Sequence, residues 1–183
     1  MVKTAPVTDL DPSEAEMAVH VARFRDIPST AKSFIDTRLP GHEREIYTII
    51  GGGVLEDPDI RPPLPPQDFH LAIIRAEPGK GAALHSHLTQ EVFMALSGRW
   101  AICWGPRGER EVILEQYDTI SVPVHLMRGF RNAGEETALL LAIVGGHDPG
   151  KVGWPAEMKE RVRGIGYELG DDGLLREVPR TPA

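Results

Sequence analysis

The sequence predicts an all-β protein, a barrel or a sandwich, and three observations support this fold class. Short apolar segments follow one another between residues 69 and 144, and turn-forming clusters such as SG, GPRGE and NAGEE separate them. Segments such as RWAICW are rich in the β-branched and aromatic residues that strands favour. The chain shows no internal repeat, so one β domain accounts for this region.

The elements before this domain are less regular. Residues 1–18 are expected to form a flexible arm, and residues 19–68 to form N-terminal strands and a proline-rich linker that pack on the barrel or on a dimer partner. Strand-like segments lie at residues 19–28 and 43–54. Residues 56–68 hold five of the 16 prolines, which excludes a helix or a central strand and favours an extended connection.

Residues 69–147 are expected to form the β domain itself. Its first strand, FHLAIIRA at residues 69–76, ends at the turn sequence PGKG. The later strands are predicted within residues 91–96, 99–104, 111–114, 117–123 and 137–144. Residues 148–183 are expected to form a C-terminal helix and tail, because WPAEMKERVRGIG has an amphipathic pattern with a proline suited to the first turn and glycines suited to the stop.

Composition excludes several classes of partner. The net charge of −7 disfavours nucleic acids and anionic membrane surfaces, because neither polyanion attracts an acidic protein. No apolar run approaches the length of a membrane span, and the N-terminus lacks the apolar run of a signal peptide. Cys103 is the only cysteine, so no internal disulfide forms. We therefore expect a cytoplasmic protein with neither a nucleic-acid nor a membrane partner.

Candidate metal ligands gather in PGKGAALHSHLTQEVFMALSG, residues 78–98. On a helix, His85 and His87 would point in different directions, whereas on a strand residues two apart share a face and both imidazoles converge. The flanking turn sequences and the β-forming RWAICW favour a strand. With Glu91 on the following strand, two imidazoles and one carboxylate meet, which is a ligand set that holds a divalent metal on one face.

The same segment resembles the first motif of the cupin superfamily, G(X)5HXH(X)3E(X)6G. Gly79, His85, His87, Glu91 and Gly98 stand at its fixed positions. The resemblance implies a double-stranded β-barrel, or jelly roll, with one cupin domain, an N-terminal arm and a C-terminal helix. It also implies that the two histidines and the glutamate bind a divalent metal ion, with Fe²⁺ favoured and Zn²⁺, Ni²⁺ or Mn²⁺ as alternatives.

The second motif of that superfamily, G(X)5PXG(X)2H(X)3N, is degenerate in this chain. YDTISVPVHLMRGFRN aligns through Pro123 and Asn132. Tyr117 replaces the first glycine, His125 replaces the second, and Arg128 stands where the family has a histidine as its fourth metal ligand. The fourth ligand of the family is therefore not carried over to this sequence.

An arginine cannot ligate a metal, because its guanidinium keeps its proton. At about 5 Å from a divalent ion its charge would be repelled by roughly 6–7 kcal/mol at an effective dielectric constant of 20. Arg128 therefore turns away from the metal, or the site is poor in metal, or an anionic substrate lies between the two charges; an equal alternative is that Arg128 pairs with a carboxylate of the barrel. We assign Arg128 to anion binding, His125 to the barrel mouth and Phe93 to the apolar wall beside Glu91.

The resemblance implies a metal-binding protein, and we expect a non-haem iron-dependent dioxygenase that acts on a small carboxylic or aromatic acid. Two alternatives stay open: a sensor or binding protein that holds a small anionic ligand without turnover, and a metal-dependent isomerase or hydrolase. We also expect a homodimer, because the apolar faces of residues 19–54 exceed what one small barrel covers.

Overall fold

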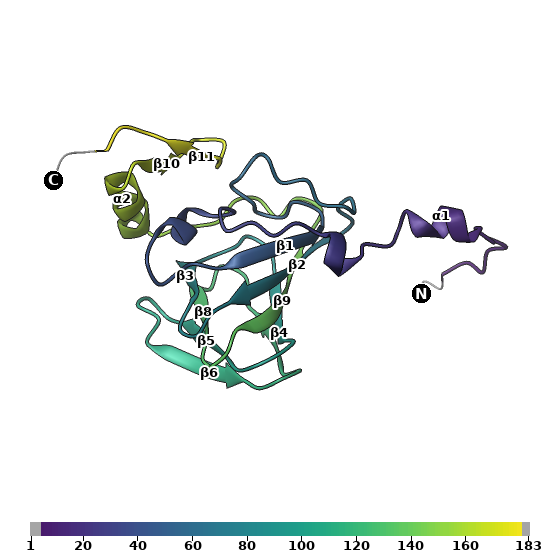
Figure 1. Cartoon of the computed structure of the whole chain (residues 1–183), viewed down its shortest axis with the longest axis horizontal. Helices are drawn as coiled ribbons and strands as arrows, with labels where there is room; N and C mark the ends of the chain where they lie inside the picture. Colours follow the sequence, from purple (N-terminus) through teal and green to yellow (C-terminus); the bar gives the residue numbers. More distant parts are fainter. Residues whose placement is uncertain (1–4, 181–183) are drawn as a thin grey trace.

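A computed structural model describes residues 5–180 and shows two antiparallel sheets packed face to face (Figure 1). The first four residues of the expected arm and the last three of the expected tail lie outside the described residues. One sheet has the strand order β1 (Glu45–Ile50), β2 (Phe69–Ala76), β9 (Ala138–Gly145), β4 (Glu91–Ala95) and β7 (Thr119–Val122). The other has the order β3 (Gly81–His85), β8 (Arg128–Asn132), β5 (Trp100–Trp104) and β6 (Arg110–Leu114). The predicted all-β jelly-roll fold is confirmed.

The core lies between the two sheets and follows from the alternation of apolar residues along each strand. In β4 and β9 every second residue is buried, so one face of each strand turns inward. Phe93 and Leu140 of the five-stranded sheet meet Trp100, Ile102 and Phe130 of the four-stranded sheet in one cluster. The ring of Phe130 lies edge-on to Phe93, with 5.2 Å between the ring centroids.

Two turns within the degenerate second motif have a left-handed backbone conformation. Tyr117 and His125 are the non-glycine residues with positive φ among those described, at 71° and 64°. Both stand where the superfamily motif has glycine, the residue that adopts this conformation without strain. The turns have therefore kept the left-handed backbone although the glycines have been replaced.

The N-terminal region differs from the strands expected there. Residues 43–54 do contain a strand, β1, but the strand expected over residues 19–28 is wrong: the 3₁₀-helix η1 (Phe24–Asp26) stands in its place. The only backbone pairing that the described N-terminal segment makes with β1 is the bridge between Thr30 and Ile46, so residues 19–28 have no strand to pair with. The arm, with the short helix α1 (Glu14–Ala18), extends away from the sheets (Figure 1).

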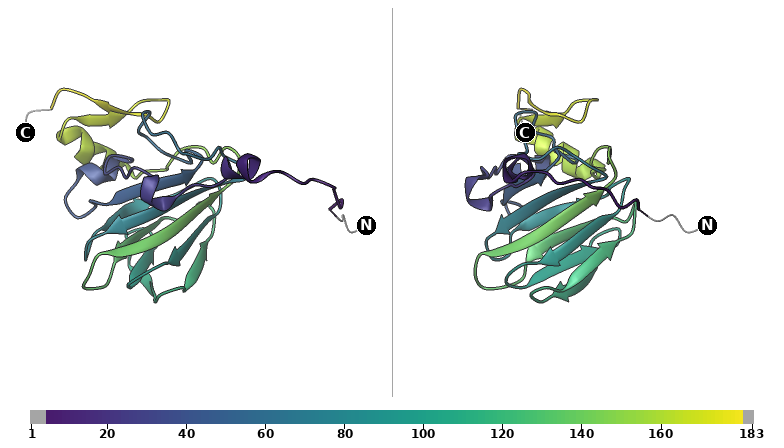
Figure 2. Two further views of the ribbon diagram at one scale, coloured as in Figure 1. Left: turned by 45° about the vertical axis from the view of Figure 1, so that its right-hand side comes forward. Right: turned by 90° about the vertical axis from the view of Figure 1, so that its right-hand side faces the viewer.

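The C-terminal elements form a second apolar layer at one end of the sandwich, above the strands in Figure 2. They are the helix α2 (Ala156–Gly164), as the sequence predicts, and the hairpin of β10 (Tyr167–Leu169) and β11 (Leu175–Glu177). Met158 and Val162 of α2 pack with Ile35 of the 3₁₀-helix η2 (Ile35–Arg38) and with Trp154. Within residues 5–180, no helix is both long enough and apolar enough to cross a membrane.

Candidate metal centre

The three predicted ligands come from both sheets and meet between them. His85 is the last residue of β3, His87 follows two residues later, and Glu91 opens β4 in the opposite sheet. All three side chains are buried, and one ligand atom from each lies within 4.8 Å of the others. We call this set the histidine–glutamate cluster. It is the one group among the described residues whose side chains could hold a metal ion together.

The hydrogen bond of His85 fixes which of its nitrogens can bind a metal. Its Nδ1 lies 2.7 Å from the carbonyl oxygen of Ala83, so Nδ1 carries the proton and donates it. The lone pair therefore stands on Nε2. A backbone carbonyl that orients a ligand histidine in this way is typical of metal sites in proteins.

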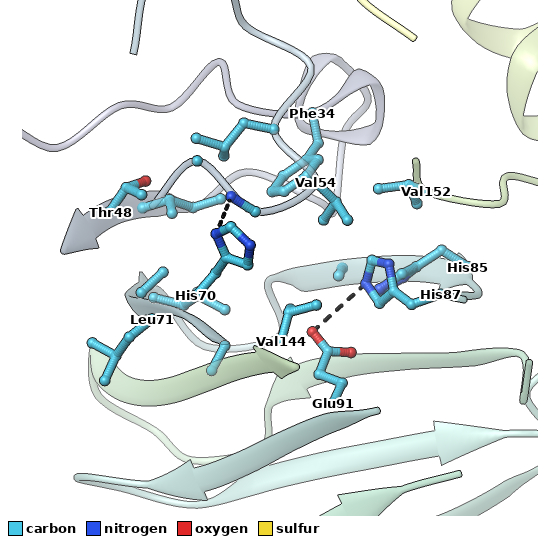
Figure 3. A pocket seen from close by; sticks show the side chains of 18 of the residues that line it. Phe34, Thr48, Val54, His70, Leu71, His85, His87, Glu91, Val144 and Val152 are labelled. Carbon is cyan, nitrogen blue, oxygen red and sulfur yellow. Dashed lines mark hydrogen bonds and ion pairs between the residues drawn. The ribbon is translucent and has the colours of Figure 1, made fainter. Parts of the chain in front are cut away.

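His87 lies beside the carboxylate without forming an ion pair. Its Nε2 is 3.7 Å from Oε1 of Glu91 (Figure 3), and its Nδ1 is buried without a hydrogen-bond partner among the described residues. Burial, with a smaller contribution from the charge of Arg128, lowers the pKa of His87 to about 3. Because the imidazole of His87 is neutral, the positive charge beside Glu91 comes from Arg128.

Glu91 pairs with Arg128 through one carboxylate oxygen only. Arg128 donates to Oε2 from Nε at 2.9 Å and from Nη2 at 2.7 Å, and its side chain is 1% exposed. The other oxygen, Oε1, faces His87. Burial raises the pKa of Glu91, and Arg128 opposes this shift. Of the possibilities that the sequence leaves open for Arg128, the structure therefore shows pairing with a carboxylate of the barrel.

The donor set fits a divalent metal ion. Burial lowers the pKa of His85 well below its usual value, with further lowering by His87 and Arg128, so the imidazoles of the cluster carry no protons that a metal would have to displace at neutral pH. One free carboxylate oxygen completes a set of two nitrogens and one oxygen. His85, His87 and Oε1 of Glu91 are thus the atoms that would hold the ion.

A cavity of about 630 Å³, counted with its open mouth, begins at the cluster and extends along the inner face of the five-stranded sheet (Figure 3). Most of its lining is apolar or glycine: Phe34, Ile46, Gly51, Gly52, Gly53, Val54, Leu55, Leu71, Ala72, Ile74, Ala82, Phe130, Ala142, Val144, Val152 and Trp154. The polar lining residues outside the cluster are Arg44, Thr48 and His70.

Trp154 closes one side of the cavity and is held there by a buried acid. Its ring lies 5.3 Å from the ring of His85, and its Nε1 donates to Oε1 of Glu56. The other oxygen of Glu56 accepts from the backbone N–H of Ile35 at 2.6 Å. Burial raises the pKa of Glu56 to about 8, although both hydrogen bonds oppose this shift. Glu56 therefore joins the N-terminal and C-terminal segments behind the cavity wall.

The three residues assigned to ligand binding from the sequence do not line this cavity. Arg128 lies behind Glu91, and Phe93 is fully buried in the core against Phe130. The side chain of His125 is exposed, and its backbone N–H donates to the carbonyl oxygen of His87 at 3.1 Å. His125 thus contacts the cluster through its backbone.

The sequence did not reveal the polar residues on the cavity wall that β1 forms, away from the histidine–glutamate cluster. Thr48 and Ile46 share the inward face of β1, and Arg44, just before the strand, continues the same alternation. Polar residues at inward positions of a predicted strand are the signal that could have identified them. Trp154 and Glu56 carried no such signal, because the segments that bring them together are almost a hundred residues apart in the sequence and meet only in the fold.

Comparison with known proteins agrees with this architecture. Residues 72–144 match the family model described as the cupin domain. The polyketide cyclase RemF from Streptomyces resistomycificus aligns with a TM-score of 0.55 and 18% identity, over 75% of this chain and 87% of its own. An uncharacterized conserved protein with a double-stranded beta-helix domain from Klebsiella pneumoniae aligns with a TM-score of 0.43 and 21% identity, over 48% of this chain and 76% of its own. No curated protein matches the chain.

Proposed function

Because residues 72–144 form a cupin domain, we propose that the protein is a metal-dependent enzyme whose metal is held by the histidine–glutamate cluster. The reaction that we propose is the oxygenation of a small organic acid by a non-haem iron centre. The observation that carries this proposal is the buried set of two imidazoles and one carboxylate oxygen at the end of an apolar cavity. Identities near 20% support the fold alone, and the chemistry follows from the side chains of the site.

The charges around the cluster favour an anionic ligand. Arg128 cancels the charge of Glu91, and both imidazoles are neutral. A divalent ion would therefore give the buried site a net charge of about +2, which a carboxylate ligand reduces. The apolar lining would then surround the remaining body of the acid and keep water from it.

A ferrous ion held by His85, His87 and Glu91 would supply the activation of dioxygen toward an organic acid. The protein orients the atoms that would hold the ion. The hydrogen bond from His85 to Ala83 fixes one ligand nitrogen, and the pair with Arg128 leaves one oxygen of Glu91 free. Trp154 and Phe34 line the cavity and limit the directions from which a substrate reaches the cluster.

The test begins with the metal content of protein purified without a chelator or a nickel resin. We expect about one divalent ion per chain in the wild type and at least a tenfold loss of metal affinity in His87→Ala. His20→Ala, which changes an exposed histidine just after the arm, is the matched control and should bind metal like the wild type. Equal metal binding by the wild type and His87→Ala would reject the metal site.

The reaction is tested by oxygen uptake after anaerobic loading with iron. Aromatic acids and keto acids form the panel, and we expect at least one of them to accelerate oxygen consumption in the wild type but not in His87→Ala. Iron-loaded protein that binds acids but consumes no oxygen with any of them would contradict the oxygenase assignment. That result would instead support a sensor without turnover or a metal-dependent isomerase or hydrolase.

A further inference from the structure

We propose that Thr48 is the hydrogen-bonding residue of a second subsite, at the end of the cavity far from the histidine–glutamate cluster. The ligand that fits both ends has an acidic head at the cluster, an apolar body and an acceptor oxygen, such as a hydroxyl or carbonyl group, beside Thr48. This inference rests on the proposed function, because it takes the cluster as the place where the acidic head is held.

The first observation is a hydroxyl without a partner. The side chain of Thr48 lines the cavity and is 6% exposed, and its Oγ1 has no hydrogen-bond partner among the described residues. Buried hydroxyls are nearly always hydrogen-bonded, so an unpaired one requires an explanation. A rotation of about 120° about the Cα–Cβ bond moves the hydroxyl to another staggered position, so the hydroxyl can turn toward a ligand in the cavity.

The second observation is the position of Thr48 in the sheet. Thr48 lies on β1 and Glu91 on β4, with β2 and β9 between them. Three strand spacings of about 4.8 Å separate the two strands by roughly 14 Å along the sheet. In Figure 3, Thr48 and Leu71 stand at one side of the cavity, while His85 and His87 stand at the other. Thr48 therefore cannot be a metal ligand of the same cluster.

The third observation is the small size of the side chains between the two ends. Thr48 is the register partner of Ala72 on β2, and Ala72 is the partner of Ala142 on β9. Val144 stands beside Ala142 on the same face of β9 and is the register partner of Glu91. Alanine and valine on the inward face leave room above this part of the sheet, and His70, the register partner of Val144 on β2, also lines the cavity between its two ends.

The other polar groups of the cavity are already engaged by the protein. His70 accepts from the backbone N–H of Gly53 at 2.8 Å through Nδ1, and its Nε2 donates to the carbonyl oxygen of His147 at 3.3 Å. The terminal nitrogens of Arg44 donate to Asp36 at 3.0 Å, and only its Nε is also buried without a partner. Donors without partners on the face of β1 favour an acceptor atom on the ligand.

The experiment uses three pairs of hydroxamic acids, and the two members of each pair differ in one hydroxyl group. A hydroxamate head binds divalent metals, so it serves as the probe for the cluster, and the second compound carries a hydroxyl on the para position of its phenyl ring. Each pair is prepared with no, one or two methylene groups between head and ring, because the reach to Thr48 sets the optimum. Titration calorimetry on full-length protein loaded with Zn²⁺ measures the affinities without any turnover.

We expect the wild type to prefer the para-hydroxyl compound by about tenfold at the optimal spacer, which is the size of one net hydrogen bond. Thr48→Val removes the hydroxyl at nearly constant volume and should abolish this preference, while Thr48→Ser should keep it. Thr119→Val, on the exposed face of β7, is the matched control and should leave the preference unchanged.

The outcomes separate the subsite from the metal site. If hydroxamates bind in a manner that requires zinc and His87, but the wild type shows no para-hydroxyl preference at any spacer or Thr48→Val keeps it, the subsite is wrong and the metal site stands. If zinc-loaded and metal-free protein bind the hydroxamates with equal affinity, both the metal site and the subsite that rests on it are overturned.

Discussion

Arg128 donates both of its hydrogen bonds to Glu91 to the same oxygen, Oε2, so the second carboxylate oxygen stays available to the two histidines. One arginine thereby balances the charge of Glu91 and leaves one of its oxygens free to bind a metal. The arginine stands at the motif position where the superfamily has a fourth ligand, and it acts on the third ligand instead.

Removal of this guanidinium should destabilise the metal-free protein. Arg128→Met keeps the length of the side chain but leaves the carboxylate of Glu91 buried without a partner, so we expect a loss of about 3–5 kcal/mol in the free energy of unfolding. Denaturant unfolding in the presence of a chelator measures this loss. Arg131→Met, on the same strand, is the control: its ion pair with Glu111 is exposed, and its loss should cost less than about 1 kcal/mol.

Arg128→His should tighten metal binding. Position 128 is the register partner of His85 across β3 and β8, so a histidine there lies next to a ligand of the cluster. The substitution adds a nitrogen donor and removes a positive charge, and both changes favour a divalent ion. Competition with a coloured chelator should show at least a tenfold rise in Zn²⁺ affinity. An affinity equal to that of wild type would mean that position 128 does not reach the ion.

Glu56 should make stability fall as the pH rises. Its pKa is about 8 in the folded protein and 4.5 as the reference for the unfolded chain, so the folded state holds a proton that the unfolded state has released. The contribution is complete below about pH 4.5 and is lost as the pH rises through 8. Melting temperatures between pH 5 and pH 8 check this for wild type and Glu56→Gln.

The glutamine variant should be less stable at pH 5, by about 1–3 kcal/mol, because one amide cannot accept hydrogen bonds from both Ile35 and Trp154. The difference from wild type should shrink toward pH 8, where wild type has lost its advantage. Glu157→Gln, at an exposed position of α2, should show a difference from wild type that does not change with pH. A constant difference for Glu56→Gln as well would show that Glu56 is ionised throughout.

Glycine should stabilise the two strained turns. Tyr117 and His125 have positive φ, a conformation that costs a residue with a side chain about 1 kcal/mol or more. Tyr117→Gly and His125→Gly should each raise the free energy of unfolding by up to about 1 kcal/mol, since both side chains are exposed. Val124→Gly, next to His125 and without positive φ, should lower it. A loss of stability in both turn variants would show that their side chains make contacts that outweigh the strain.

The expected homodimer stays a prediction, and the arm is the segment that would make it. Six apolar residues of the arm, of η1 and of the segment that joins them are exposed: Val7, Leu10, Met17, Val19, Val21 and Phe24. Cover by a second copy would remove this surface from water. Light scattering should give the mass of a dimer for the full chain and of a monomer after deletion of residues 1–23. Val112→Ser, on the exposed strand β6, should leave the dimer intact, and a monomeric full chain would end the proposal.

The fold and the candidate metal ligands were predictable from the sequence because both show in patterns along the chain. Alternation along each strand predicts which face turns inward, and the motif spacing identifies His85, His87 and Glu91 as one set, although their side chains meet only when the two sheets pack. The strand predicted at residues 19–28 was wrong because alternation shows only that a segment can be a strand. Whether its backbone has a partner strand is decided by the fold.

The tertiary structure decided what the other polar residues do. Nothing local shows that Arg128 turns toward Glu91, because the two residues come from different sheets and meet only when the sheets pack. The same holds for Glu56 with Trp154, and for the open space between Thr48 and the cluster, which exists because alanines on β2 and β9 share one row. The sequence by itself determined the candidate metal-binding residues and the strands near them. The charge pairs, the shape of the cavity and the length of molecule that it accepts depend on distances between segments that are far apart in the chain.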